Sequence, residues 1–408
     1  MGVGHGHLQA LQGSALSVRE IGAGGVEHPA NPFAALPGRI ADPEAGVASH
    51  YGEPLSEQRA LEAGAAVVDL SHHGIVVVSG PDRLSWLHSM TSQHLLALRP
   101  GESTETLLLD ANGRIEHAAR VVDDGERTCL LVDAGSAEPL AAFLTRMRFA
   151  LRVEVEDRSG THAAVLAFDG PAADAVRALG PEAEWRDPWA EVARGGVQYA
   201  RTETEHAGAQ WSAVQFVFAR ERLDDVVGLV RSGAVRAAGL LALDALEVRA
   251  WRPSQAGDVD ERSIPHELDW MRTAVHLTKG CYRGQETVAK VHNLGHPPRR
   301  LALLHLDGTG GELPVAGALV FAGAGSATEP GARPVGRITR AALHHEWGGI
   351  ALALLKRSVP EDAPLEVRGG AEGNDPQAEP GEPIAAVQEV IVPATAGAAR
   401  AVPRLNRI

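Results

Sequence analysis

Apolar runs short enough for strands alternate with stretches of helical periodicity in the first part of the chain. Residues 75–78 form such a run, and the Gly-Pro pair that follows leads into apolar positions at helical spacing. Two extended runs, 104–109 and 114–122, flank Asn112 and Gly113. An Asn-Gly pair between extended runs is a strong hairpin signal, because both residues tolerate positive φ. The pattern therefore predicts a strand, a helix and a hairpin in this order.

The same order of elements recurs further along the chain. Residues 164–168 form an apolar run, a second Gly-Pro pair follows, and 172–179 have a helical pattern. The strand pattern of 211–218 and the helix pattern of 221–230 then match an earlier strand and helix in kind and order. This repetition predicts two pseudo-repeated α+β halves packed together, with a cleft between them.

After residue 300 the periodicity changes. Short apolar runs at 301–306, 318–321, 335–339 and 350–355 alternate with Gly and Pro turns, which is typical of a small β-barrel. A polar, Gly- and Pro-containing stretch near 369–383 is predicted to be a loop or a hairpin tip. The patterns together predict an α+β protein with four parts: a flexible N-terminal extension (1–45), a first α+β half (46–160), a second half (161–300) and a C-terminal barrel (301–408).

Composition and charge narrow the function classes. The chain has 408 residues, is 44% hydrophobic and carries a formal net charge of −14 at pH 7. Such a charge repels nucleic acid and anionic membranes, so we expect no direct binding to either. The two cysteines, Cys129 and Cys281, are too few for a disulfide framework or a closed metal site, which favours a reducing cytoplasm and predicts no bound metal. Neither a membrane span nor a secretory signal is expected.

The densest chemistry lies in residues 279–286, which read Lys-Gly-Cys-Tyr-Arg-Gly-Gln-Glu and are called the cysteine motif below. The motif resembles the signature of the YgfZ family of folate-binding proteins, relatives of the glycine cleavage T-protein (aminomethyltransferase). Segments 71–74, 80–82 and 109–115 also resemble landmarks of the T-protein superfamily, in the same order. The resemblance extends over about residues 50–395. It implies a T-protein-like fold with a central folate cleft, and a functionally central motif cysteine.

We hypothesise that the cysteine motif supplies the reactive group of the protein. Lys279 and Arg283 place positive charge near Cys281, which favours the nucleophilic thiolate. Gly280 and Gly284 let the backbone turn tightly and approach a ligand. Taken without the motif around it, the same cysteine would be interpreted as a small buried residue on a structural turn.

The resemblance implies folate contacts for the motif and for the hairpin tip: Lys279, Gly280, Tyr282, Arg283, Gly284, Gln285, Glu286, Asp110, Gly113 and Arg114. Gln285 and Glu286 suit a second role equally well, as caps of the helix or strand that follows. Turn chemistry alone also accounts for Asp110 and Gly113. Downstream of the motif, a basic patch either attracts an anion such as a folate carboxylate or is a solvated surface; it consists of Lys290, His292, His296, Arg299 and Arg300.

Two departures from the T-protein pattern bear on activity. An ungapped placement puts His94 where the T-protein has its catalytic aspartate, and Arg249 where its Arg-x-Glu-Ala-Gly pattern has a folate-contacting glutamate. An imidazole does not stabilise cationic folate and aminomethyl species as a carboxylate does, so aminomethyl transfer is not expected. Arg249 either engages the folate tail or pairs with Asp244 or Glu247. Trp251 either stacks on a folate ring or packs in the core.

The resemblance implies an accessory protein that binds tetrahydrofolate or a derivative and supports the assembly or repair of iron-sulfur clusters. Its partners would be a reduced folate and iron-sulfur client enzymes or assembly proteins. Any effect on enzymes that modify transfer RNA would pass through their clusters. Two alternatives stay open: a tetrahydrofolate-dependent one-carbon transferase, and a folate-independent thiol redox protein.

Overall fold

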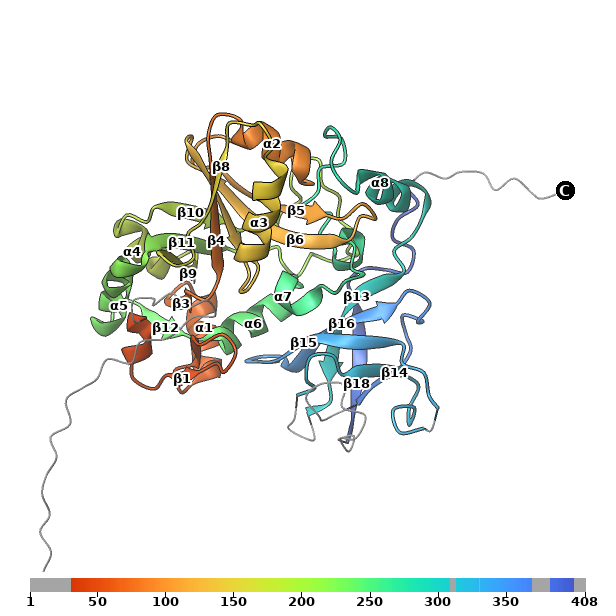
Figure 1. The fold of residues 1–408 in the computed structure, drawn as a ribbon. Helices are drawn as coiled ribbons and strands as arrows, with labels where there is room; N and C mark the ends of the chain where they lie inside the picture. The colour runs from red at the N-terminus through yellow and green to blue at the C-terminus, as the bar shows by residue number, and fades with distance from the viewer. Residues whose placement is uncertain (1–30, 309–312, 330, 369–381, 400–408) are drawn as a thin grey trace, which may run out of the picture.

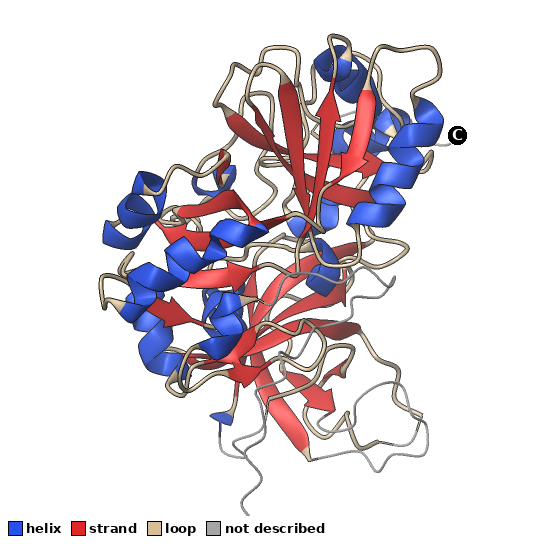
Figure 2. Cartoon of the chain, turned by 60° about the vertical axis from the view of Figure 1, so that its left-hand side comes forward, coloured by secondary structure: helices blue, strands red, loops and turns tan. Residues whose placement is uncertain are grey.

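A computed structural model describes residues 31–308, 313–329, 331–368 and 382–399 of the chain (Figure 1). Two five-stranded sheets and a closed six-stranded barrel form its framework. Each sheet carries helices on one face, as Figure 2 shows. This arrangement confirms the predicted α+β class and the C-terminal barrel.

The first sheet has the strand order β5-β6-β7-β4-β8. Its strands are β4 (Gly74–Ser79), β5 (Ser103–Leu109), β6 (Ile115–Asp123), β7 (Arg127–Val132) and β8 (Glu154–Asp157). Helices α2 (Arg83–Met90) and α3 (Ala137–Met147) pack on it through a buried cluster that includes Val76, Leu87 and Leu140. The antiparallel pairing of β5 with β6 confirms the predicted hairpin.

The second sheet has the strand order β10-β11-β9-β3-β12. Its strands are β3 (Ala66–Leu70), β9 (His162–Phe168), β10 (Ala183–Arg186), β11 (Ala213–Ala219) and β12 (Arg236–Ala238). Helices α4 (Pro171–Ala178) and α5 (Leu223–Arg231) cover one face and confirm the two predicted helices. Helices α1 (Pro54–Glu62) and α6 (Leu240–Arg249) pack against each other beside β12.

Strand β3 crosses from the first half of the sequence into the second sheet. It pairs antiparallel with β9 and parallel with β12. All five of its residues are buried, and a strand inside a sheet is the position that covers both faces and pairs both edges. One strand of the first segment (46–160) thus belongs to the sheet whose other four strands come from residues 161–300.

The C-terminal barrel closes in the order β13-β16-β15-β14-β17-β18, with β18 paired back to β13. Its strands are β13 (Arg299–Leu306), β14 (Leu319–Ala322), β15 (Gly336–His344), β16 (Gly348–Lys356), β17 (Leu365–Arg368) and β18 (Pro383–Val390). Most of the polar stretch expected near 369–383 lies outside the described residues.

Residues 31–45 pack onto the second sheet and are not the flexible extension that their composition predicts. They contain η1 (Pro32–Ala35) and β1 (Ile40–Ala41), and β1 pairs with β2 (Ala48–His50). Phe33 is buried with residues of α5 and β3, and Asn31 donates hydrogen bonds to Asp69 (2.6 Å) and Ser71 (2.8 Å). One buried aromatic ring thus orders a segment of low periodicity. Residues 1–30 lie outside the described chain.

The two sheets and the barrel meet in one shared core. A single buried cluster contains Val68 of β3, Leu107 of β5, Trp251 after α6 and Leu303 of β13. The remaining short elements border it: η2 (Pro188–Ala190), η3 (Arg220–Arg222), α7 (Gln255–Asp258), η4 (Pro265–Leu268) and α8 (Gln285–Leu294). In the described ranges, no helix is both long and apolar enough to cross a membrane.

Candidate functional site

The cysteine motif lies in the turn that leads into α8, and it packs against the tip of the β5–β6 hairpin. Gly284 precedes the helix with a φ of 84°. A Cβ atom at Gly284 would lie 2.6 Å from the carbonyl oxygen of Asp110, and one at Gly113 would lie 3.0 Å from Thr287. The fold thus brings together two segments that the sequence separates widely, and they meet without room for a methyl group.

The two motif glycines have different roles. Gly284 has the left-handed backbone and the close contact just described, whereas a Cβ at Gly280 would meet no atom within 4 Å. Gly284 has the tight-turn backbone expected of it, and its close neighbour in the fold is the hairpin tip.

Turn chemistry explains the hairpin tip. The Oδ1 atom of Asp110 accepts hydrogen bonds from the backbone N–H groups of Asn112 (2.7 Å) and Arg114 (2.8 Å). The side chain of Arg114 is exposed. The carboxylate of Asp110 therefore closes the turn, as Asx turns do.

Lys279 clamps the motif to the end of α2. Its Nζ atom donates hydrogen bonds to the carbonyl oxygens of His88, Thr91 (2.5 Å) and Gln93 (3.1 Å). The ammonium group is buried and lies 4.9 Å from the ring centroid of Tyr282. Burial lowers the pKa of Lys279 to about 8. The cation therefore caps the last carbonyls of a helix, a position that favours positive charge.

Cys281 is exposed, and the positive charges expected to act on it are engaged elsewhere. Arg283 forms an ion pair with Glu116 at 2.6 Å, and Lys279 faces the three carbonyls. Among the described residues, no hydrogen bond or ion pair involves the thiol of Cys281. The motif presents an accessible sulfur on an anchored turn.

The remaining motif residues support the turn. The amide of Gln285 donates to the carbonyl oxygen of Lys279 at 3.4 Å, a long contact that spans the turn. Glu286 is exposed in the first turn of α8, where a carboxylate interacts favourably with the helix dipole. Tyr282 is buried in the shared core, and burial raises its pKa.

The basic patch is only partly a surface. Arg299 forms ion pairs with Asp260 (2.6 Å) and Glu267 (2.8 Å), and Arg300 is fully buried inside the barrel, where it donates to Gln388 (2.7 Å). These two guanidinium groups are therefore unavailable to an anion, contrary to both expectations. Lys290 is exposed, His292 lies 3.1 Å from the hydroxyl of Tyr199, and His296 bonds the carbonyl of Ala396 at 2.8 Å.

Arg249 and Trp251 lie on opposite sides of the end of α6. Arg249 is 3.8 Å from Glu62 and its guanidinium lies over the ring of Trp347 at 5.2 Å. It therefore contacts α1 and the β15–β16 hairpin, and its expected pairing with Asp244 or Glu247 is wrong. Trp251 is 3% exposed in the shared core and has a φ of 59°, a strained value for a bulky residue.

A buried polar network joins both sheets to the residue after Trp251, and sequence reasoning missed it. Arg252 donates to Glu105 of β5 (2.7 Å) and to Asp187 before η2 (2.9 Å). Three buried donors around this core have no hydrogen-bond partner among the described residues: Trp251 Nε1, Trp270 Nε1 and Arg252 Nη1. A signal existed in Glu105, an acid in a strand whose last three residues are leucines.

His94 belongs to a row of three imidazoles. Its ring centroid lies 4.7 Å from that of His88 and 5.3 Å from that of His276. The backbone N–H of Leu95 donates to Nδ1 of His88 at 3.3 Å. Burial, followed by the charge of Lys279, lowers the pKa of His88 to about 4. At the position expected to hold a carboxylate, His94 thus lies between two imidazoles whose pKa values are lowered by burial.

Residues 48–201 match the family model of the GCVT N-terminal domain. An aminomethyltransferase of Frankia alni is 29% identical, and the alignment covers 84% of this chain and 89% of that protein. An aminomethyltransferase of Thermus thermophilus is 28% identical over 79% of this chain and 88% of that protein. The crystal structure of the glycine cleavage system aminomethyltransferase T from Bartonella henselae has a TM-score of 0.65 and 19% identity, and covers 87% of this chain and 93% of that one. The chain is thus similar in sequence to aminomethyltransferases and shares the fold of a T-protein.

Some relatives align with this GcvT-like chain over only part of their own length. A chloroplastic protein of Arabidopsis thaliana is 24% identical, and the aligned region covers 65% of this chain but 61% of that protein. The GCVT model ends at residue 201, so the cysteine motif lies beyond the matched segment. The match to this family model therefore gives no information about the cysteine motif.

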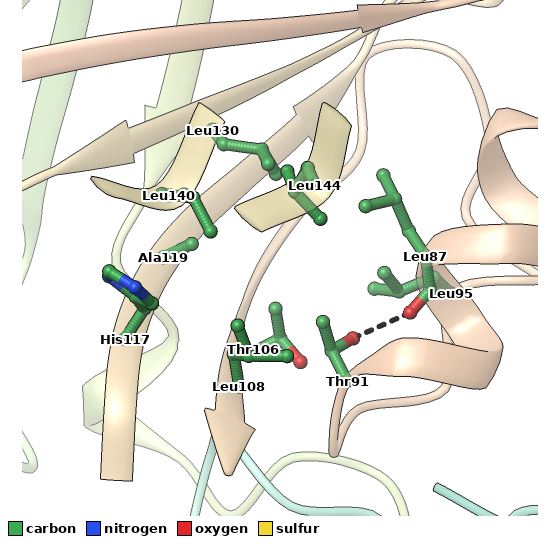
Figure 3. A pocket seen from close by; sticks show the side chains of 10 residues that line it. All are labelled: Leu87, Thr91, Leu95, Thr106, Leu108, His117, Ala119, Leu130, Leu140 and Leu144. Carbon is green, nitrogen blue, oxygen red and sulfur yellow. Dashed lines mark hydrogen bonds between the residues drawn. The ribbon is translucent and has the colours of Figure 1, made fainter. Parts of the chain in front are cut away.

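A small cavity between the first sheet and its two helices is not a ligand site. Figure 3 shows it between the first sheet and helices α2 and α3, lined mainly by leucines such as Leu87, Leu108 and Leu144. Its volume is about 10 Å³, no more than one water molecule needs, and its apolar lining offers water few partners.

Asp244 of this GcvT-like chain gives a pH-dependent prediction. Burial raises its pKa to about 7, and Arg340, the nearest cation, is already paired with Glu247 and with Asp258 (2.9 Å). A carboxyl whose folded pKa exceeds its unfolded value of about 4 loses stability as pH rises through that interval. Asp244→Asn should therefore raise the free energy of unfolding by about 1–3 kcal/mol at pH 8 and change it little at pH 4.

Urea unfolding at several pH values tests this expectation. The matched control is Glu247→Gln, one turn along the same helix, which removes a direct partner of Arg340 and should lower stability at pH 8. If both variants change the free energy of unfolding at pH 8 in the same direction and by the same amount, Asp244 is not the carboxyl that destabilises the fold there.

Proposed function

We propose that this GcvT-like protein binds a reduced folate and supports the assembly or repair of iron-sulfur clusters through Cys281. The geometry of the cysteine motif carries the proposal. Lys279 and Gly284 are held by buried contacts on either side of Cys281, while the cysteine itself is exposed. An accessible thiol on an anchored turn is suited to contact with a partner protein or its cluster.

Tetrahydrofolate or a derivative is the proposed cofactor. The shared fold and the relatives named aminomethyltransferases support it. The unpartnered donors Trp251 Nε1, Trp270 Nε1 and Arg252 Nη1 fit a pterin, because its ring nitrogens and oxygen accept hydrogen bonds. When bound, tetrahydrofolate supplies a carrier for one-carbon groups.

The row of imidazoles around His94 favours an accessory role over aminomethyl transfer. A transferase has to stabilise positive charge that develops on the folate, and a carboxylate does this better than an imidazole beside Lys279. A tetrahydrofolate-dependent transferase remains the second candidate, because several relatives carry that name. A folate-independent thiol redox protein is the third, supported by the exposure of Cys281 alone.

The proposed partners are iron-sulfur client enzymes or assembly proteins. Enzymes that modify transfer RNA would be affected through their clusters, since a net charge of −14 opposes direct contact with RNA. The proposed compartment is the cytoplasm, in line with a chain whose two cysteines are both free.

Calorimetric titration with tetrahydrofolate, on the wild type and on Cys281→Ala, tests the proposal. We expect binding in both, because the orphaned donors lie in the core and not at the thiol. We also expect Cys281→Ala to lose the ability to restore activity to a damaged iron-sulfur enzyme. Absence of folate binding in the wild type rules out the cofactor, and full restoration by the variant rules out the role of the cysteine.

The second cysteine serves as the internal control. Cys129 is half-buried in β7, and burial raises the pKa of its thiol to about 12. Iodoacetamide at neutral pH should therefore modify Cys281 and spare Cys129. Turnover of an aminomethyl donor by the purified protein would instead favour the transferase.

A further inference from the structure

A surface cavity of about 590 Å³ is lined by two imidazoles of this row, His94 and His276. Its walls come from three separate parts of the chain: the segment after α2, the loop at 193–194 and the residues just before the cysteine motif. The volume lies within the usual range for small-molecule pockets. We call this cavity the histidine pocket; His94, His276, Arg99, Arg194, Glu102 and Thr278 are among the residues that line it.

Backbone hydrogen bonds hold the walls of the histidine pocket together. The N–H of His276 donates to the carbonyl of Ser92 (3.0 Å), and that of Leu277 donates to the carbonyl of Gly195 (2.9 Å). A Cβ at Gly195 would lie 2.4 Å from the ring of His276. The imidazole is therefore packed directly against the neighbouring loop, and its position is fixed by the fold.

The histidine pocket is lined by two arginines and one acid, although the protein as a whole is acidic. Glu102 is its acidic lining residue, and its carboxylate accepts the N–H of Arg99 at 2.9 Å and lies 3.7 Å from the Nε atom of Arg99. Among the described residues, no acidic partner is found for His94, His276 or Arg194. The pocket thus has an acid already paired with Arg99, and Arg194 as a cation without an acidic partner among the described residues.

We propose that the histidine pocket binds a small oxyanion, a phosphate or a carboxylate group, between Arg194 and His276. A guanidinium beside an imidazole offers charge-assisted donors to such a group. The hydroxyl of Thr278, 3.5 Å from Nδ1 of His276, adds a neutral donor at the same wall. The ligand would lie a short distance from Cys281, which follows Thr278 by three residues in the chain. This site goes beyond the proposed function, because it needs no folate.

Binding should strengthen as the pH falls. The groups that face His276 are His94, Arg194 and Lys279, with His88 behind His94 and Glu102 across the pocket. Burial and then the charge of His94 lower the pKa of His276, so its imidazole is largely neutral at pH 8. An anion favours the protonated ring, and affinity should therefore rise between pH 8 and pH 6.

Calorimetric titration with inorganic phosphate and with citrate, at low ionic strength and without folate, tests the site. We expect at least one probe to bind the wild type, and Arg194→Gln and His276→Gln each to weaken that binding tenfold or more. Phosphate alone would identify a tetrahedral oxyanion, and citrate alone a polycarboxylate. Arg194 is exposed, so its replacement leaves the fold intact.

The control is Arg231→Gln, a similarly exposed arginine at the end of α5, which should bind like the wild type. The proposal is overturned if neither probe binds, if Arg194→Gln binds as the wild type does, or if Arg231→Gln is equally weakened. Tetrahydrofolate affinity should be unchanged in Arg194→Gln; its loss would make the pocket part of the folate site and would refute a separate one.

Discussion

Replacing Arg252 by methionine is expected to lower the free energy of unfolding by about 3–5 kcal/mol, the usual cost of removing one partner from a buried ion pair. Arg252 lies between Glu105 of the first sheet and Asp187, which follows β10 and precedes η2, and the three side chains are at most 5% exposed. Its guanidinium also stacks over the ring of Trp189 at 5.1 Å. The variant leaves two carboxylates in the core with no cation between them.

The loss of unfolding free energy in Arg252→Met should depend on pH. Burial already raises the pKa of Asp187 in the presence of Arg252, and removal of the cation raises that pKa further. A carboxyl with a raised folded pKa destabilises the fold above its unfolded pKa and stops doing so once it is protonated. The deficit of the variant should therefore be larger at pH 8 than at pH 5.

Urea unfolding of Arg252→Met at the two pH values measures both effects. Arg127→Met is the matched control, because Arg127 pairs with Asp124 at 3.0 Å on the surface, where such pairs contribute about 0–1 kcal/mol. An unfolding free energy equal to that of the control would show that the network does not hold the sheets together.

Substituting alanine for Gly284 is expected to separate the cysteine motif from the hairpin. The residue has a φ of 84°, which costs a side-chain-bearing residue about 1–2 kcal/mol. The new Cβ would also lie 2.6 Å from the carbonyl oxygen of Asp110, and such overpacking typically adds about 1–3 kcal/mol. We expect a total loss of about 2–5 kcal/mol.

The same motif contains the control for this variant. Gly280→Ala places its Cβ in open space and leaves the backbone outside the left-handed region, so the expected change is within about 0.5 kcal/mol. Thermal unfolding gives the difference in stability. The rate of Cys281 alkylation should rise in Gly284→Ala, because the turn loses its anchor, and should stay unchanged in Gly280→Ala. Equal behaviour of the two variants would contradict the assigned contact.

The N-terminal segment and the basic patch show where sequence patterns failed. No helical or strand pattern of apolar residues surrounds Phe33 in the sequence. Its burial against the second sheet depends on residues of α5 and β3, which are far away in the chain. Arg299 and Arg300 look like surface cations in sequence, yet Asp260, Glu267 and Gln388 surround them. A run of charged residues in the sequence does not reveal which distant residues will pair with them. Those distant residues decide whether the charged side chains are buried or exposed.

The sequence by itself determined the local elements, the barrel, the hairpin and the presence of a cysteine motif. These depend on hydrophobic periodicity and turn residues, which act over a few positions of the chain. Only the tertiary structure decided the place of β3 in the second sheet, the hydrogen bonds of Lys279 to the end of α2, and the bridge of Arg252 between Glu105 and Asp187. Each of these joins groups remote in sequence, and their energies depend on distances and burial that exist only in the folded chain.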